Sequence, residues 1–387
     1  MLNYTRSMAR INLDAITHNF QEIRKNINPD TKVVAVIKAD GYGHGAVPIA
    51  HEIEDLDYIW GFATATVSEA LELRNNGISK PILILGVTFE EDFEIIVEED
   101  IRPAVFDLET AKKFSDLATL LNKTVHIHIK TDTGMGRIGF QVNENSADEV
   151  LIISQLPNLE VEGIFTHFSK ADEVDKTYAK QQISKFNEMI SLVEKRGVNI
   201  PLKHCSNSAG IIELPEVNMN MVRAGIIIYG LWPSNEVDFE RLKLQPVMEL
   251  KSRIVHIKKM DEGHKISYGG TYETKPNDVI ATVSFGYADG YPRGLSNKGY
   301  VLVRGKKAPI VGRVCMDQFM INVKDIEDAS VLDEVTLVGT DGNETITMEE
   351  LGDISGRFNY EFACDITKRV PRVYVRDNQV IDFDTNE

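Results

Sequence analysis

Between residues 32 and 230, short β-rich runs alternate with amphipathic stretches. Apolar runs rich in β-branched residues are typical of parallel strands that are buried on both faces. Residues 33–37 form such a run, and seven further short β-rich runs follow, at residues 58–63, 81–85, 102–106, 124–129, 161–166, 202–204 and 221–226. Most of them are separated by helical patterns such as VSEALELRNNG. The alternation predicts a (β/α)8 barrel of the TIM type rather than a doubly wound open sheet, since no GxGxxG fingerprint follows the first strand.

The sequence pattern changes after about residue 242. Runs rich in β-formers occur at residues 247–257, 279–284, 300–303, 309–314, 320–323 and 334–338, with only one good helical stretch, at residues 348–354. Turn signals such as Asp-Gly and Gly-Asn separate these runs, which is typical of a mostly β domain. The sequence therefore predicts an α/β protein with two domains, a barrel over residues 1–241 and a mostly β C-terminal domain over residues 242–387. A length of 387 residues also suits two domains better than one.

Composition narrows the functional classes. A net charge of -17 argues against a nucleic-acid partner, because phosphate binding requires clustered Lys and Arg. No apolar run reaches the roughly 18 residues that a membrane span needs, and the N-terminal residues lack the apolar core of a signal peptide, so we expect a cytoplasmic protein. Cys205, Cys315 and Cys364 are widely spaced and fit neither a disulfide framework nor a zinc pattern, so no metal site is expected.

One lysine stands at a position suited to chemistry. The string KVVAVIKADGYGHGA, residues 32–46, places Lys38 at the carboxyl end of a buried strand and follows it with three glycines, which should break regular structure. Barrels and open α/β sheets carry their chemistry at this end of the strands. A partly desolvated lysine has a lowered pKa and can act as a Schiff-base nucleophile. The pattern alone also allows an ordinary surface lysine whose stem lies along the strand end.

The segment from Val34 to Gly45 resembles the pyridoxal-phosphate (PLP) lysine motif of alanine racemases. The resemblance extends over essentially the whole chain, from NLDAITHNFQEIRK to YEFACDITKRVPRVYV. It implies a homodimeric, PLP-dependent alanine racemase that interconverts L- and D-alanine and supplies D-alanine for peptidoglycan synthesis. It also implies that Lys38 holds PLP as an internal aldimine and serves one face of the substrate Cα.

A second matching string, KTDTGMGRIGF, follows the fifth predicted strand. The resemblance implies that Arg137 approaches the phenolic oxygen of the cofactor and the substrate carboxylate, and that Lys130 is carbamylated. Carbamylation would replace a cation beside Arg137 with an anion and so remove a like-charge repulsion. Spacing alone also allows a simple turn with an ion pair between Lys130 and Asp132.

Positions after the last three barrel strands complete the expected cofactor site. Arg223 interrupts an apolar strand, where a charge needs a specific reason, and the resemblance places it against the pyridine nitrogen. Arginine cannot give that nitrogen a proton, so transamination and other side reactions should be suppressed. By resemblance, the cofactor contacts are Lys38, Tyr42, His167, Asn207, Ser208, Arg223, Gly225, Ile226, Tyr229 and Tyr360. Taken singly, a histidine at a strand end, an Asn-Ser helix cap or a packed tyrosine is a common structural feature.

Racemisation needs a second base on the face opposite the lysine, and the string HKISYGGTYE supplies Tyr268. The resemblance assigns this role to Tyr268 of the partner subunit. An unperturbed tyrosine has a pKa near 10, which would have to fall by about three for a base at neutral pH. In the same family Met316 and Asp317 contact the substrate, and Tyr287 and Tyr291 lie near the entrance corridor. A β-turn aromatic is the structural alternative for Tyr268.

Other proteins share parts of this pattern. PLP decarboxylases of the same architecture resemble a different pattern, which has an acidic residue at the pyridine nitrogen. Arg223 at that position argues against a decarboxylase. A non-catalytic PLP carrier resembles only the N-terminal half of the chain. A cofactor-free Schiff-base aldolase has no use for a phosphate cradle around Ser208 and Ile226. A broad-specificity or serine racemase of the same family is an open alternative, because pocket size depends on side-chain positions.

Overall fold

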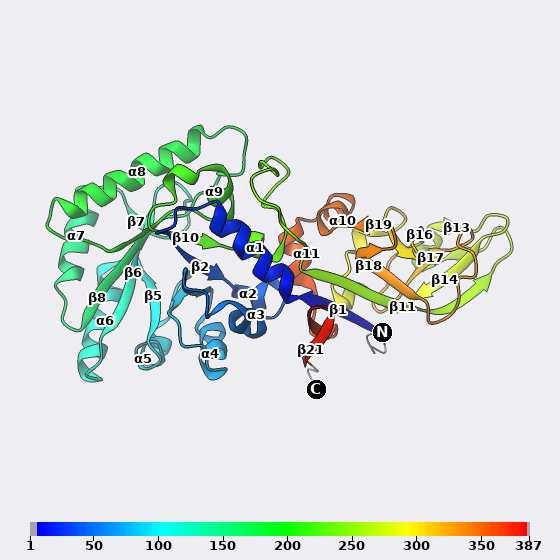
Figure 1. The fold of residues 1–387 in the computed structure, drawn as a ribbon, viewed down its shortest axis with the longest axis horizontal. Coiled ribbons are helices and arrows are strands. Elements are labelled where there is room, and N and C mark those ends of the chain that lie inside the picture. Colours follow the sequence, from blue (N-terminus) through cyan, green and yellow to red (C-terminus); the bar gives the residue numbers. More distant parts are fainter. Residues whose placement is uncertain (1–5, 385–387) are drawn as a thin grey trace.

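The computed structural model describes residues 6–384, which form a barrel joined to an elongated β domain (Figure 1). The barrel strands are β2 (Lys32–Val36), β3 (Ile59–Thr64), β4 (Ile82–Ile84), β5 (Ile101–Val105), β6 (Val125–Asp132), β8 (Leu159–Phe165), β9 (Leu202–His204) and β10 (Met221–Ala224). These parallel strands run in the order β10-β2-β3-β4-β5-β6-β8-β9, and the short β7 (Phe140–Gln141) pairs with β6. The N–H of Arg223 donates to the carbonyl of Ser206 at 3.0 Å, which brings the two ends of the sheet together. The predicted barrel is confirmed, with a strand at each of the eight predicted runs.

Helices between the strands cover the outside of the barrel (Figure 1). They are α1 (Leu13–Lys25), α3 (Ala46–Ile53), α4 (Val67–Asn75), α5 (Phe93–Glu98), α6 (Leu108–Leu120), α7 (Glu144–Ser154), α8 (Thr177–Glu194) and α9 (Ser208–Glu213). Several of them begin at a side-chain cap: Asp107 accepts from the N–H of Thr110 at 2.7 Å, and Thr66 and Glu69 form a capping box. The apolar faces of the helices pack on the strands and share one core with them.

The segment after β2 is more regular than the glycine pattern predicts. It forms a left-handed turn, α2 (Lys38–Tyr42), in which residues 39–42 all have φ between 50° and 59°. Residues other than glycine rarely adopt this conformation because Cβ crowds the following carbonyl. A hydrogen bond of 2.8 Å from the N–H of Gly41 to the carbonyl of Ile37 closes the turn. The turn brings both of its end residues, Lys38 and Tyr42, to the same cavity.

The second domain is built on a ten-stranded sheet in the order β19-β18-β15-β16-β17-β14-β11-β1-β20-β21. Its strands after residue 242 are β11 (Met248–Lys259), β14 (Val279–Val283), β15 (Tyr300–Val303), β16 (Lys306–Val311), β17 (Phe319–Asn322), β18 (Glu334–Asp341), β19 (Glu344–Ile346), β20 (Arg372–Arg376) and β21 (Gln379–Asp384). A separate two-stranded ribbon pairs β12 (Lys265–Ile266) with β13 (Tyr272–Glu273). Two helices complete the domain, α10 (Met348–Ser355) and α11 (Asn359–Asp365). The expected mostly β character of this part is confirmed.

One strand of this sheet comes from the other end of the chain. β1 (Ser7–Asn12) lies between β11, to which it is antiparallel, and β20, to which it is parallel. The predicted division placed these residues with the barrel. The strands that pair with β1 are distant in sequence, so no local sequence pattern indicates the pairing. The division at residues 241 and 242 stays a prediction for the rest of the chain.

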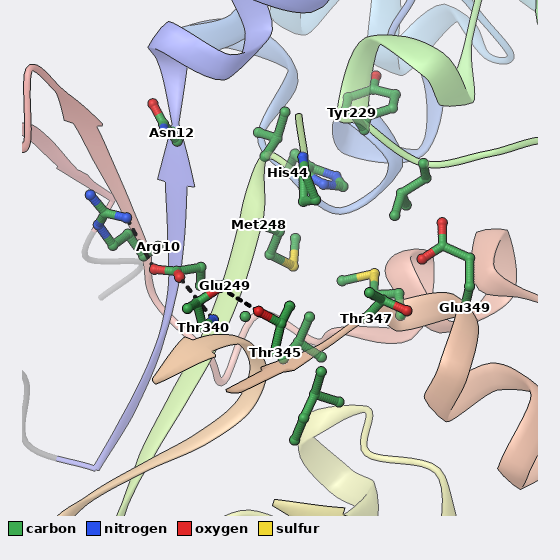
Figure 2. Close-up of a pocket in the computed structure, with 17 residues that line it drawn as sticks. Arg10, Asn12, His44, Tyr229, Met248, Glu249, Thr340, Thr345, Thr347 and Glu349 are labelled. Atoms are coloured by element: carbon green, nitrogen blue, oxygen red, sulfur yellow. Dashed lines mark hydrogen bonds and ion pairs between the residues drawn. The ribbon is translucent and has the colours of Figure 1, made fainter. Parts of the chain in front are cut away.

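A cavity lies where the barrel meets the β domain (Figure 2). β1, β11, β18 and the start of α10 line it on one side, and His44 and Tyr229 line it from the barrel. The His44 ring stacks on Tyr229 with centroids 4.5 Å apart, and its Nδ1 lies 2.9 Å from the carbonyl of Tyr42. These contacts hold His44 against Tyr229 and against the backbone of the left-handed turn.

Candidate active site

A cavity of about 540 Å³ lies at the carboxyl ends of the barrel strands. Ligand pockets commonly measure about 300–1,000 Å³, so this space suits a cofactor with a small substrate. Strand ends β2, β8, β9 and β10 supply one side, and α11 of the second domain supplies another. Nine predicted cofactor residues line this single cavity: Lys38, Tyr42, His167, Asn207, Ser208, Arg223, Gly225, Ile226 and Tyr360. The structure therefore brings together residues that are scattered over the sequence, while their roles stay predictions.

Lys38 carries an amine whose pKa is lowered. Burial is the main cause, and the positive charge of Arg137 adds to it. The carboxylate of Glu69, whose charge acts in the opposite direction, accepts from the N–H of Ala39 at 2.7 Å. A lowered pKa enlarges the neutral fraction of the amine, which is the form that attacks a carbonyl carbon.

Arg223 is buried, and its guanidinium is held by the ends of neighbouring strands. Its terminal nitrogens donate to the carbonyls of Thr166 at 2.7 Å and of His204 and Cys205 at 3.1 Å. Burial lowers the pKa of Arg223 to about 10, which leaves the group cationic at neutral pH. Within residues 6–384 no hydrogen bond uses its Nε–H, so one donor is left for a ligand in the cavity.

His167 lies between Arg223 and Asn207. Its Nδ1 is 3.4 Å from a terminal nitrogen of Arg223, and its Nε2 is 3.5 Å from the amide nitrogen of Asn207. Burial and then the charge of Arg223 hold the pKa of His167 well below its usual range, so the ring is neutral. Asn207 is itself fixed, since its side-chain oxygen accepts from the N–H of Gly210 at 3.0 Å. The result is an immobilised neutral ring at the mouth of β8.

A small polar cradle lies at the other end of the cavity. The N–H of Gly225 donates to Oγ of Ser208 at 3.0 Å. A Cβ on Gly225 would lie 3.2 Å from the Tyr42 hydroxyl and 3.4 Å from Ser208 Oγ, so glycine keeps this space open. The Tyr42 ring packs on Tyr229 at 5.0 Å and faces Tyr360 at 6.0 Å. Hydroxyl and backbone N–H groups around an open space suit a phosphate.

Lys130 and Arg137 lie near this cavity without lining it. Lys130 is buried and donates to the carbonyls of Thr131 at 2.7 Å and Ile138 at 3.2 Å. Arg137 is exposed and forms no hydrogen bond or ion pair among the described residues, although its charge reaches Lys38. The alternative ion pair between Lys130 and Asp132 is not formed; Asp132 instead accepts from backbone N–H groups of its own loop.

Tyr268, Met316 and Asp317 lie together on the β domain, away from the Lys38 cavity. All three line one surface depression of this domain. Tyr268 is 71% exposed and Met316 is 52% exposed, and Asp317 forms an ion pair of 2.8 Å with Arg369. A catalytic phenol cannot serve the Lys38 cavity of its own chain from this position.

The two tyrosines expected near an entrance corridor separate in the structure. Tyr287 is exposed, whereas Tyr291 is buried in the β domain, stacked on Phe319 at 5.1 Å. Tyr291 is therefore a core residue of this chain.

Some neighbours of the site were not predicted. His204 and His128 lie behind Arg223, and Cys364 lines the cavity beside Tyr360. The alternating string HIHIK, which carries His128 two residues before Lys130, was the available signal for a polar interior face. No local pattern pairs His128 with His204, because they lie on different strands.

Comparison with known proteins settles the family. The sequence matches the family described as "Alanine racemase, N-terminal domain" over residues 11–233 and "Alanine racemase, C-terminal domain" over residues 247–374. The chain belongs to the alanine racemase family. It is 46% identical over 374 residues to the alanine racemase of Clostridium tetani, covering 96% of each chain. It is 48% identical over 367 residues to that of Methanococcus maripaludis, covering 95% of this chain and 98% of the relative.

Solved structures of the family have the same fold. The alanine racemase of Clostridium difficile superposes with a TM-score of 0.94 at 42% identity, with 99% of both chains covered. That of Bacillus anthracis with bound L-Ala-P gives a TM-score of 0.91 at 38% identity, over 99% of this chain and 98% of that one. By this homology the protein is an amino-acid racemase, an isomerase that acts on alanine, in a family that depends on PLP. No helix within residues 6–384 is both long and apolar enough to cross a membrane.

Proposed function

We propose that this protein is a PLP-dependent alanine racemase and a homodimer, whose active sites are each completed by Tyr268 of the partner subunit. One observation carries the proposal: nine cofactor candidates share one cavity, whereas Tyr268, Met316 and Asp317 share an exposed surface of the other domain. Two such sets meet if two chains pair head to tail across a two-fold axis. The D-alanine formed would supply peptidoglycan synthesis.

The cavity residues fit PLP by their chemistry. Lys38 offers an amine of lowered pKa, and Arg223 offers its remaining Nε–H to an acceptor on the ring. Ser208, Tyr42 and the backbone at Gly225 surround a space that a side chain on Gly225 would fill. When bound, PLP supplies an electron-withdrawing ring that acidifies the Cα proton of an amino acid.

The residues of the protein then divide the work of moving that proton. Lys38 takes or returns a proton on one face of Cα, and Tyr268 of the partner subunit does so on the other face. Arg223 stays cationic and gives up no proton, so the side reactions that need a protonated ring nitrogen are disfavoured. Arg137, near the mouth of β6, provides a guanidinium for the substrate carboxylate.

Mixing two inactive variants tests the shared site. Lys38→Ala and Tyr268→Ala should each be inactive, and Lys38→Ala should also lack the near-visible absorbance of bound PLP. When the two are unfolded and refolded together, mixed dimers contain one site with both Lys38 and Tyr268 intact. Random pairing then restores about a quarter of wild-type activity. If mixing restores nothing while each variant folds and dimerises, Tyr268 does not act across the interface. Initial rates with alanine and serine on the wild type measure how narrow the specificity is.

A further inference from the structure

A row of hydrogen-bonded side chains crosses the interior of the barrel from Arg223 to Glu162. A terminal nitrogen of Arg223 lies 2.8 Å from Nδ1 of His204. Nε2 of His204 lies 2.9 Å from Nδ1 of His128. Nε2 of His128 lies 3.3 Å from Oε2 of Glu162. Both imidazoles are fully buried, and Nε of Arg102 pairs with the same carboxylate oxygen at 3.3 Å.

The two ends of this row fix the direction of every hydrogen bond in it. A guanidinium only donates, so Nδ1 of His204 must accept, and a neutral ring then carries its hydrogen on Nε2. That hydrogen is donated to Nδ1 of His128, whose own hydrogen must therefore lie on Nε2. The carboxylate of Glu162 only accepts, which suits this arrangement. Both histidines are thus held as neutral Nε2–H tautomers.

The surroundings support neutral rings in fixed orientations. Burial lowers the pKa of His204, and the charge of Arg223 lowers it further. Burial also lowers the pKa of His128, against the opposite effect of Glu162 and with added effects of Arg102 and Arg223. The His204 ring also stacks on Phe165, with centroids 4.9 Å apart and an interplanar angle of 7°. A stacked ring cannot turn to exchange its two nitrogens without losing this contact.

Arg223 needs such a row because it has no acidic neighbour. Within residues 6–384 no carboxylate lies within salt-bridge distance of it. A buried cation without a counter-charge is costly, and the direct partners of Arg223 are backbone carbonyls and imidazoles. Glu162 supplies a negative charge two rings away, which it shares with Arg102, and Arg102 is itself also paired with Asp100 at 2.7 Å. Hydrogen bonds in a row polarise one another, so each ring becomes a better acceptor toward the guanidinium.

We propose that Glu162, through His128 and His204, positions the Arg223 guanidinium and balances its charge. These three side chains are positioning residues, since none of them lines the Lys38 cavity. The inference rests on the proposed function only where Arg223 is assigned to the cofactor ring. The row itself belongs to the protein without any ligand.

The first test reads the tautomers directly. Full-length protein labelled with 15N in histidine is examined by NMR without and with PLP, and the two signals are assigned with His128→Gln and His204→Gln. We expect both rings as neutral Nε2–H tautomers from about pH 6 to 8. A cationic ring, or a hydrogen on Nδ1 of either residue, overturns the proposal. Because the ligand-free protein suffices, this result does not depend on whether the protein racemises alanine.

The second test removes the charge at the far end. Glu162→Gln keeps an acceptor for His128, and we expect kcat to fall roughly 3- to 30-fold with little change in KM. The near-visible absorbance of bound PLP should shift as well, which a merely weakened fold would not cause. His126→Gln is the matched control, because His126 lies two residues earlier on β6 and contacts Asp100 instead. Wild-type kcat and spectrum in Glu162→Gln, or an equal loss in His126→Gln, overturns the proposal.

Two substitutions of His128, in the middle of the row, distinguish the loss of hydrogen bonds from a loss of stability. The amide of His128→Gln can accept from His204 and donate to Glu162, whereas His128→Leu can do neither. We expect His128→Gln to retain more of kcat than His128→Leu at equal thermal stability. Equal loss in both at equal stability contradicts a role for the hydrogen bonds.

Discussion

Lys130 is the residue whose chemistry depends most on its burial. Its pKa is lowered to about 8, first by burial and then by the charge of Arg223. A substantial neutral fraction therefore exists at slightly alkaline pH, and only the neutral amine reacts with carbon dioxide. The resulting carbamate would place an anion near Arg137 and Arg223, where the amine would be a third cation.

We predict that Lys130 carries a carbamate. In protein equilibrated with 13C-bicarbonate, NMR should show one carbamate signal that grows as the pH rises through about 8, because deprotonation of the amine precedes the reaction. Lys130→Arg should lack the signal, and Lys123→Arg, on the exposed surface, should keep it. The absence of a bicarbonate-derived signal up to about pH 9 would falsify this prediction.

Single residues also differ in how far their roles could be read from the sequence. Lys38 and Arg223 were found because a charge at the end or inside of an apolar strand is conspicuous. His128 and His204 were missed because each alone looks like an ordinary strand histidine. Their role arises from a 2.9 Å contact between two strands, and no one-dimensional pattern contains that contact.

At the scale of elements, the left-handed turn α2 joins the two domains around the lysine. The carbonyl of Gly43, just after the turn, accepts from Nε of Arg372 at 3.0 Å. A Cβ on Gly43 would lie 2.3 Å from the carbonyl oxygen of Ala363 in α11, which carries Tyr360. The turn and α11 therefore fit only because residue 43 is glycine.

Two glycine substitutions separate the cost of backbone conformation from the cost of this contact. Gly43 and Gly77 have similar φ of +78° and +84°, but nothing lies within 4 Å of a Cβ on Gly77. Gly77→Ala should lower the free energy of unfolding by roughly 1–2 kcal/mol, the cost of a left-handed residue. Gly43→Ala should lower it further and should also weaken PLP binding, because α11 must move. Denaturant unfolding and PLP titration measure both effects, and equal behaviour of the two variants would contradict the argument.

Elements with a strong local signal were predicted, and elements defined by distant partners were not. All eight barrel strands appeared in the sequence as short β-rich runs between helical patterns, and β11, β14, β15, β16, β17 and β18 as runs between turns. The runs of the sequence did not include β1, β20 and β21, nor the short strands β7, β12, β13 and β19. β1 and β20 pair with each other between the two ends of the chain, and β21 then pairs with β20.

For the whole molecule, this pairing ties the β domain to the barrel through two connections. β1 enters α1 directly, and β11 continues from the last barrel segment. The surface bearing Tyr268 is therefore carried on a sheet that includes the N-terminal strand, between β11 and β20. In the proposed dimer, correct placement of Tyr268 of the partner subunit relative to the Lys38 cavity would depend on that sheet remaining whole.

Removal of β1 should therefore lower the stability of the protein far more than removal of an equally long strand at the edge of the sheet. β1 and β21 each have six residues. β1 pairs with a strand on each side, and its side chains Ala9 and Ile11 are fully buried. Among the described residues, β21 pairs only with β20, and its Val380 is 42% exposed. We expect a chain beginning at Leu13 to melt at a much lower temperature, to lose dimer formation and to lose racemase activity. A chain ending at Asn378 should keep the dimer and most of its activity, because an edge strand removes one ladder only. Thermal unfolding measures the stability of the two truncated chains, and sedimentation measures whether they form dimers. If both melt together, β1 is not the strand that holds the sheet, and the tie between the domains must lie in the β11 connection alone.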